Sequence, residues 1–395
     1  MMSPESSSSF RFLKITLHIA FFASGIATVL IGQILPILAE RLKLNDGQAG
    51  LFFTAQFSGS LIGTFLTNWF GKKNKFLSAT VVGCFLMACG VLFLNFDSWT
   101  ICLTGFFING LGIGLTLPSI NLLTLELNPA RATSALNVLN FFWGIGAITS
   151  QPFVDFTTRE TNLVLPTTML AAAFALLAVT LVLMPWEIEK NPIDIEEKTV
   201  YSDTPIWTHP IAWAIAAFNF IHVGFESGMS GWLKTYGQRL ENPAAVNLLP
   251  PIFLYFLFFV VGRGIAPLFL RFLSDNLMLL INLLVVLFGM SVLLFTDNHL
   301  FVGFGAAIAG FGTASIFPTN ISRFTKFFGA SAIRSATPLF ICGTLGAAFT
   351  TWLIGFASNY FDNLRSGMFV LAFSIAALIG LQIFLMFRHA KKLNN

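Results

Sequence analysis

Charged side chains are scarce in this chain of 395 residues. Asp, Glu, Lys and Arg together supply 10% of it, whereas ordinary soluble domains carry about a quarter. Hydrophobic residues supply 55%, phenylalanine alone accounts for 46 residues, and the mean hydropathy is +0.78. So little charge cannot cover so much apolar surface in water. The composition therefore excludes a soluble globular protein and predicts one that lies in lipid.

Cysteine is also rare, and the sequence shows no arrangement of residues that would support catalysis. The four cysteines lie in or at the ends of apolar runs, with neither disulfide-framework nor zinc-ligand spacing. No Ser/His/Asp or Cys/His set, metal motif or phosphate-binding loop is present. We therefore expect no enzymatic activity, no catalytic residues, no cofactor and no bound metal.

The net charge is small, at +4, and the basic residues are scattered among short loops. Nucleic-acid-binding proteins gather Lys and Arg on one face, so we expect no nucleic-acid partner. If the N-terminus lies inside, fifteen Lys and Arg residues fall on the cytoplasmic side and six on the other. The positive-inside rule then predicts a multi-pass protein of the cell's inner or plasma membrane, with both termini in the cytoplasm.

Long apolar runs fill most of the chain. Crossing the hydrocarbon takes a helix of roughly 20 residues, and the alternating ten-residue segments of a membrane barrel are missing. We expect an all-α integral membrane fold with 12 transmembrane helices, at residues 12–38, 47–70, 76–96, 99–124, 132–156, 163–186, 209–236, 247–272, 277–296, 299–322, 329–357 and 364–388.

One polar connection interrupts the series of apolar runs. Residues 187–208 are acidic and contain proline, which is typical of a solvated linker. This linker separates six runs from six runs. We predict an N-terminal six-helix bundle at 1–186, a cytoplasmic linker at 187–208 and a C-terminal six-helix bundle at 209–395.

The two predicted bundles repeat one another at a nearly constant offset. At an offset of 200 residues, several glycines, Ile108 and Pro118 of the first half fall on identical residues of the second half. Three more glycines match at an offset of 199. A register held across four runs of each half indicates two pseudo-symmetric bundles. Parallel repeats of this kind are typical of transporters whose site lies near the midplane between the halves. The pairs at 200 include Gly105 with Gly305, Gly110 with Gly310, Gly112 with Gly312, and Pro118 with Pro318.

Glu226 stands inside the seventh apolar run and is one of two charged residues placed near mid-membrane. Asn219, His222 and Glu226 are spaced i, i+3 and i+7, so they share one face of a helix. An ionisable side chain at this depth is costly and typical of a functional site. A structural ion pair that locks two helices is the alternative interpretation.

Arg263, in the eighth run, is the second charged residue. Counting residues along two antiparallel helices places Glu226 and Arg263 at similar depth. An unpaired charge there is costly, so we predict a direct contact between them or one bridged by a single residue. His222, whose imidazole titrates near neutral pH, either passes a proton to Glu226 or forms a hydrogen bond in the helix packing.

Several uncharged side chains are further candidates for a binding site. Amides need a partner for each of their polar groups, so those inside apolar runs indicate a polar cavity, although polar residues also help helices to pack. Trp232 either stacks on a ligand or anchors the helix at the membrane interface. The remaining candidates are Gln33, Gln56, Asn109, Asn140 and Trp143.

Three short segments carry a resemblance to a known family. The loop Asn68–Lys73 is similar to the signature G-x3-D-R-x-G-R-R, with Asn68 where Asp is usual and Trp69 where Arg is usual. The segments HVGFESGMSGWLKTY and GFGTASIFPTN, with Gly262-Arg263 between them, are similar to the fucose/glucose/galactose permease-like branch. The chain thus resembles a major facilitator superfamily transporter. The resemblance implies that helices 1, 4, 7 and 10 line a central cavity.

Together these features predict a secondary active transporter that works by alternating access. The resemblance favours a small, polar, sugar-like solute, with protons or Na⁺ as coupling ion, carried by a monomer in the lipid bilayer. The alternatives are an exporter of amphipathic or drug-like compounds and a non-transporting receptor or scaffold on the same fold. The expected substrate- or ion-binding residues are Glu226, Arg263, His222, Asn219, Asn140, Asn109, Trp143, Gln33, Gln56 and Trp232.

Overall fold

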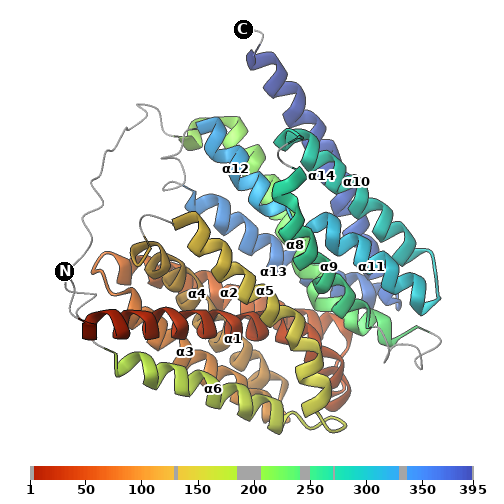
Figure 1. Ribbon diagram of the computed structural model, residues 1–395. Coiled ribbons are helices and arrows are strands. Elements are labelled where there is room, and N and C mark those ends of the chain that lie inside the picture. Colours follow the sequence, from red (N-terminus) through yellow and green to blue (C-terminus); the bar gives the residue numbers. More distant parts are fainter. Residues whose placement is uncertain are drawn as a thin grey trace. The chain divides into compact units, whose positions relative to one another are not determined.

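Membrane-spanning helices account for nearly all of the computed structural model (Figure 1). The structure describes residues 4–128, 132–184, 206–240, 250–269, 272–328 and 336–393. Within these ranges every regular element is a helix, and β-type pairing is limited to one isolated bridge between Arg159 and Asn162. The all-α membrane fold with twelve spanning helices is confirmed.

The chain divides into two compact units. Unit 1 comprises Met1–Leu44 and Leu51–Glu196, and unit 2 comprises Asn45–Gly50 and Glu197–Asn395. Most of the predicted linker lies outside the described residues; its last three residues form the short 3-10 helix η3 (Ile206–Thr208). The boundaries expected at 186 and 209 therefore stay predictions.

Unit 1 is built from the first six helices. α1 packs against α5, and α3 packs against both α4 and α6. The short helix η1 (Phe93–Asn95) lies in the turn between α3 and α4. The helices are α1 (Pro4–Leu42), α2 (Asp46–Gly71), α3 (Phe76–Leu92), α4 (Trp99–Glu126), α5 (Ala132–Thr157) and α6 (Val164–Val182).

Unit 2 repeats the same packing pattern. α8 packs against α13 as α1 does against α5, and α10 packs against α11 and α14 as α3 does against α4 and α6. The helices are α8 (Pro210–Gln238), α9 (Pro251–Phe269), α10 (Asp275–Leu294), α11 (His299–Thr313), α12 (Ile316–Phe328), α13 (Thr337–Tyr360) and α14 (Leu364–Leu393).

The first turn of α2 belongs to unit 2 because of a carboxylate at its start. Asp46 accepts two hydrogen bonds from Arg239, at 2.6 and 2.7 Å, and one from Ser358 at 2.5 Å. A carboxylate at a helix N-terminus is also favoured by the helix dipole. These contacts hold residues 45–50 against α8 and α13.

Matching glycines occupy matching surroundings in the two units. A methyl group on Gly110 would overlap the backbone carbonyl of Gln56, and one on Gly310 would overlap that of Tyr255, 199 positions after Gln56. Glycine is required at both positions because the helix backbones touch there. The repeat predicted from the sequence is confirmed at these two glycines. A methyl group on Gly146 would likewise overlap the carbonyl of Phe22 in α1, and one on Gly346 would overlap that of Phe220 in α8.

These contacts give a direct test of the helix packing. Gly110→Ala and Gly310→Ala are each expected to destabilise the protein by about 1–3 kcal/mol, because an added methyl overpacks a closed contact. Gly264→Ala is the matched control, since a Cβ at Gly264 meets nothing within 4 Å and alanine favours a helix over glycine by about 1 kcal/mol. Melting temperatures in detergent measure all three. Equal melting temperatures for Gly110→Ala and Gly264→Ala would contradict the close backbone contact described at Gly110.

The tenth span differs from the expected single helix over 299–322. It consists of α11 and α12, separated at Ala314 and Ser315. Pro318 explains the break, because proline has no N–H to donate to the carbonyl four residues earlier and its ring crowds that carbonyl. The freed carbonyl is that of Ala314. Pro118 leaves α4 continuous, and the Gly114 carbonyl that it frees accepts a hydrogen bond from Thr67 Oγ1 at 3.1 Å.

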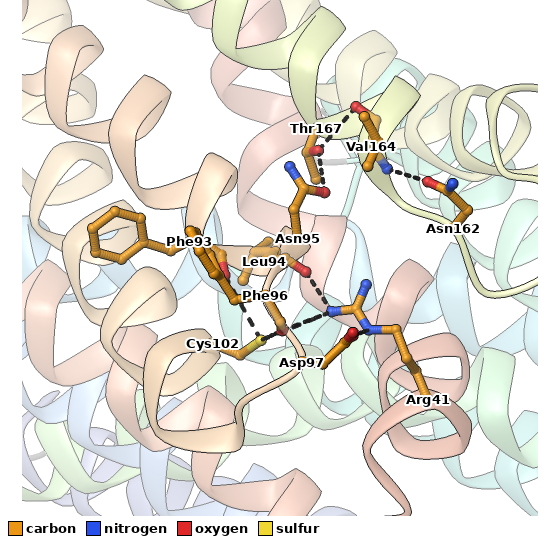
Figure 2. A network of polar contacts seen from close by, with 10 residues as sticks. All are labelled: Arg41, Phe93, Leu94, Asn95, Phe96, Asp97, Cys102, Asn162, Val164 and Thr167. Carbon is orange, nitrogen blue, oxygen red and sulfur yellow. Dashed lines mark hydrogen bonds and ion pairs between the residues drawn. The ribbon is translucent and has the colours of Figure 1, made fainter.

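An arginine clamps the turn between the third and fourth spans of each unit. In unit 1, Arg41 of α1 donates to the carbonyls of Leu94 and Phe96, and its Nε lies 3.3 Å from Asp97 Oδ1 (Figure 2). In unit 2, Arg365 of α14 pairs with Asp297, which follows Asp97 by 200 positions. The aspartate is repeated, whereas the arginine comes from a different helix in each unit.

Candidate functional site

Asn219, His222 and Glu226, which the sequence predicted on one helix face, all lie on α8. α8 begins with Pro210 in its first turn, where the missing N–H costs no hydrogen bond. Asn219 is buried, and its Nδ2 donates to the Leu339 carbonyl at 2.9 Å, while its Oδ1 has no partner among the described residues. Gly224 lets α8 approach α13, with the Gly346 carbonyl 2.8 Å from where a Cβ would lie. One face of α8 is thereby fixed against α13.

His222 and Glu226 form a buried ionisable pair on this face. His222 is fully buried, and neither of its ring nitrogens has a hydrogen-bond partner within the described ranges. His222 Nε2 lies 3.6 Å from Glu226 Oε2, and 21% of the Glu226 side chain is exposed. A partly accessible carboxylate with an imidazole one turn away can take up a proton and pass it on.

α9 presents a column of three side chains at steps of four residues. The rings of Tyr255 and Phe259 stack with their centroids 6.1 Å apart, and the Arg263 guanidinium lies 4.3 Å from the Phe259 centroid. Tyr255 and Phe259 are both fully buried. Arg263 therefore lies on the protein-facing side of α9, and an arginine over an aromatic face is a favourable cation–π pair.

The partner of Arg263 is the carbonyl that Pro318 leaves free. Arg263 Nε donates to the Ala314 oxygen at 3.2 Å, at the break between α11 and α12. No direct ion pair joins Arg263 to Glu226, and both residues are described, so the direct form of the predicted contact is wrong. The two charges still interact electrostatically, and Tyr255 interacts with both. The bridged form of the prediction therefore stays open. Helix rotation, which residue counting does not supply, decides which group each side chain meets.

The candidates in unit 1 are amides and a tryptophan, several of them buried. Gln33 is fully buried, and no described residue forms a hydrogen bond with its amide. Gln56 Nε2 donates to the Thr28 carbonyl at 3.1 Å. Asn109 is buried with Nδ2 unpaired within the described part of the chain. Trp143 Nε1 also lacks a partner there, and exposed Asn140 donates back to Leu136.

Trp232 is fully buried and donates from Nε1 to the Thr351 carbonyl at 2.9 Å. It joins α8 to α13 at this point. A tryptophan anchoring a helix at the membrane interface has its ring at the headgroup level, and the burial of Trp232 excludes that interpretation.

The repeat shows where the two units differ chemically. Phe22 and Phe220 occupy equivalent places against Gly146 and Gly346, so positions in α1 and α8 correspond at an offset of 198 in the structure. The offset of 199 at which glycines of these two spans match in the sequence, as Gly25 does with Gly224, is therefore one residue too large. Ser24 and Thr28 then correspond to His222 and Glu226. Both hydroxyls donate to backbone carbonyls one turn back. Unit 2 thus has ionisable side chains at two positions where unit 1 has hydroxyl groups that are already hydrogen-bonded to their own helix.

Sequence reasoning missed the role of Pro318 and the place of Tyr255 in the column with Phe259 and Arg263. The signal for Pro318 was present, because a proline inside a helix always frees the carbonyl four residues earlier. Tyr255, Phe259 and Arg263 share a face at i, i+4 and i+8, which the sequence also shows. In the part of the chain that the structure describes, no group of three His, Cys, Asp or Glu residues could hold a metal ion.

Comparison with known proteins decides the family. The profile of the Major Facilitator Superfamily matches residues 17–337, well over half of the chain. The chain belongs to this superfamily. As a member of it, the protein is a multi-pass membrane transporter and not an enzyme.

Individual relatives within the superfamily are distant but cover most of the chain. The glucose/mannose transporter GlcP of Bacillus subtilis is 22% identical over 380 residues, 92% of each chain. A glucose/galactose transporter of Brucella abortus is 24% identical over 340 residues, covering 80% of this chain and 81% of its own. The structure of the E. coli fucose:proton symporter FucP superposes with a TM-score of 0.61 at 20% identity, over 95% of this chain and 99% of FucP. The last comparison supports the fold alone.

The superfamily signature loop after α2 is altered in a way that the structure explains. Trp69 stands where the signature has Arg, and Lys73 Nζ lies 4.0 Å from the centroid of its ring. The turn is closed by Asn74, which adopts a left-handed conformation with φ of 52°, a conformation that asparagine tolerates better than most residues. The cation–π pair between Lys73 and Trp69 thus occupies two positions at which the signature has arginine.

Proposed function

We propose that this superfamily member is a proton-coupled importer of a sugar-like solute, with Glu226 as the proton carrier. It would act as a monomer in the inner or plasma membrane with both termini in the cytoplasm. The two matched relatives named for glucose transport support a sugar-like solute. The observation that carries the proton is the His222–Glu226 pair, a buried imidazole 3.6 Å from a partly exposed carboxylate.

The contrast between the units supports the same assignment. At the positions equivalent to His222 and Glu226, unit 1 has Ser24 and Thr28, whose hydroxyls are satisfied by their own helix. Unit 1 therefore offers amides such as Gln33 and Asn109 for hydrogen bonds to hydroxyl groups of a solute, with no charge to titrate. Proton chemistry would therefore rest on unit 2.

Uptake into proteoliposomes tests this function. Labelled hexoses and the corresponding uronic acids are offered under an inward proton gradient, an inward Na⁺ gradient or no gradient. We expect accumulation of at least one of these solutes above its external concentration under the proton gradient alone. Accumulation driven by Na⁺ would assign a different coupling ion. Failure of every solute to enter under any condition would contradict a sugar-like substrate and leave the exporter and scaffold alternatives.

A further inference from the structure

Arg263 has binding capacity that the structure does not use. Its Nε donates to the Ala314 carbonyl at 3.2 Å, and its ring contact is with Phe259. Neither terminal nitrogen of the guanidinium has a hydrogen-bond partner or an ion pair among the described residues. Neither is among the fully buried unpaired atoms. A guanidinium fixed by Nε and stacked on a ring presents its two NH₂ groups as a rigid fork, which matches the planar geometry of a carboxylate.

The net charge of Arg263 and Glu226 together depends on whether Glu226 is ionised or protonated. Glu226 interacts electrostatically with Arg263 without forming an ion pair. When Glu226 is ionised, it offsets the charge of Arg263 and the cluster is neutral. When Glu226 holds a proton, the cluster carries one positive charge inside the membrane, which is costly unless an anion joins it.

We propose that Arg263 binds an anionic group of the solute, which is therefore a sugar acid such as an aldonate or a uronate, and that it does so while Glu226 holds its proton. This inference rests on the proposed function and narrows its substrate class. Proton and anion then enter together, and the cluster is neutral both when empty and when loaded. Glu226 displaces the anion from Arg263 when it loses its proton.

Few other charged or titratable residues lie on the described helices of unit 2, and the buried Lys234 is one of them, eight residues after Glu226 on α8. His222 lies one turn from Glu226 on α8, with its Nε2 3.6 Å from Glu226 Oε2, and Tyr255 lies two turns from Arg263 on α9. α13 carries no charged side chain between Thr337 and Tyr360. α11 has only His299 at its start, and α14 has Arg365 in its first turn and its other basic residues after Phe387. On α12, Arg323 is bound to Gln382 and Lys326 is paired with Asp275.

Binding of two matched sugars tests the proposal. D-Glucuronate and D-glucose differ only at the carbon that bears the carboxylate, and their affinities follow from thermal stabilisation of the purified protein. We expect glucuronate to bind at least about tenfold more tightly at about pH 5, because charge-assisted hydrogen bonds from arginine are worth that much. The preference should shrink as the pH is raised, because Glu226 competes for Arg263 once its carboxyl group is ionised.

Three variants separate the parts of the proposal. Arg263→Met should reduce the affinity for glucuronate to that for glucose. Glu226→Gln, an uncharged mimic of the protonated state, should keep the preference for glucuronate and lose its pH dependence, so it tests the proposal even where Arg263→Met does not fold. Lys326→Met removes an exposed cation from the same unit and should leave the preference unchanged.

A transport measurement gives an independent readout. A proton and a monovalent anion together carry no charge, so glucuronate uptake should not respond to an imposed membrane potential. Glucose binding with no preference for glucuronate in the wild type would overturn the anion site and leave the proposed function intact. Binding of neither sugar would overturn both. Glucuronate uptake driven by membrane potential would overturn the paired entry of proton and anion.

Discussion

Glu226→Gln is expected to abolish proton-driven accumulation of solute while leaving solute exchange across the membrane largely intact. The substitution keeps the shape of the side chain and removes its ability to carry a proton. Exchange of labelled for unlabelled solute uses only loaded states and needs no change of protonation. Among the described residues, Glu226 is the one carboxylate within 4 Å of His222, so we expect no other group to take over its role. Uptake and counterflow into the same proteoliposomes measure the two activities.

Glu126→Gln is the matched control for this variant. Glu126 is a partly buried carboxylate at the end of α4 in unit 1, so the same substitution changes charge without touching the His222–Glu226 pair. It should leave accumulation unchanged. If Glu226→Gln still concentrates solute against a gradient, the coupling ion is carried by another group.

Glu226→Gln and Arg263→Met are each expected to lower stability more than the two substitutions do together. Removing one partner of a buried charge pair typically costs about 3–5 kcal/mol, because the other charge is left uncompensated. No ion pair joins these two described side chains, so we expect each effect to fall below that range. Unfolding of the four proteins of the double-mutant cycle measures the coupling.

Arg323→Met combined with Glu226→Gln is the control cycle. Arg323 is a buried arginine of the same unit, but it is hydrogen-bonded to Gln382 at 2.6 Å and to Asn320. Its removal should destabilise the protein independently of Glu226. Additive effects in the Glu226/Arg263 cycle would show that the two charges act separately, and a coupling of equal size in both cycles would show that it is not specific to Arg263.

Features governed by local periodicity were predictable from the sequence. Apolar runs long enough to span a bilayer gave the twelve spans, because a membrane leaves the backbone few other structures. The offset of 200 between Gly110 and Gly310 predicted matching contacts. Gly110 meets the backbone of Gln56 in the second span, and Gly310 meets that of Tyr255 in the eighth. Helix geometry likewise placed His222 one turn from Glu226.

Features that depend on how a helix rotates about its axis were not predictable in this way. Counting residues placed Arg263 at the depth of Glu226, but its hydrogen bond goes to the Ala314 carbonyl. That acceptor exists only because Pro318 breaks the tenth span. Trp232 was a candidate for ligand stacking or interface anchoring, and its indole N–H bonds to the Thr351 carbonyl in the packing of α8 on α13. Such contacts need the positions of neighbouring helices, which a single sequence does not contain.

The most direct test of proton coupling is to follow protons and solute in one experiment. Proteoliposomes with a trapped pH-sensitive dye are given an inward gradient of whichever sugar or sugar acid they accumulate, without an imposed pH gradient. Downhill entry of solute should acidify the lumen, with about one proton entering for each solute if Glu226 is the carrier. Entry of solute at the same rate with no change in luminal pH would contradict a proton-coupled mechanism.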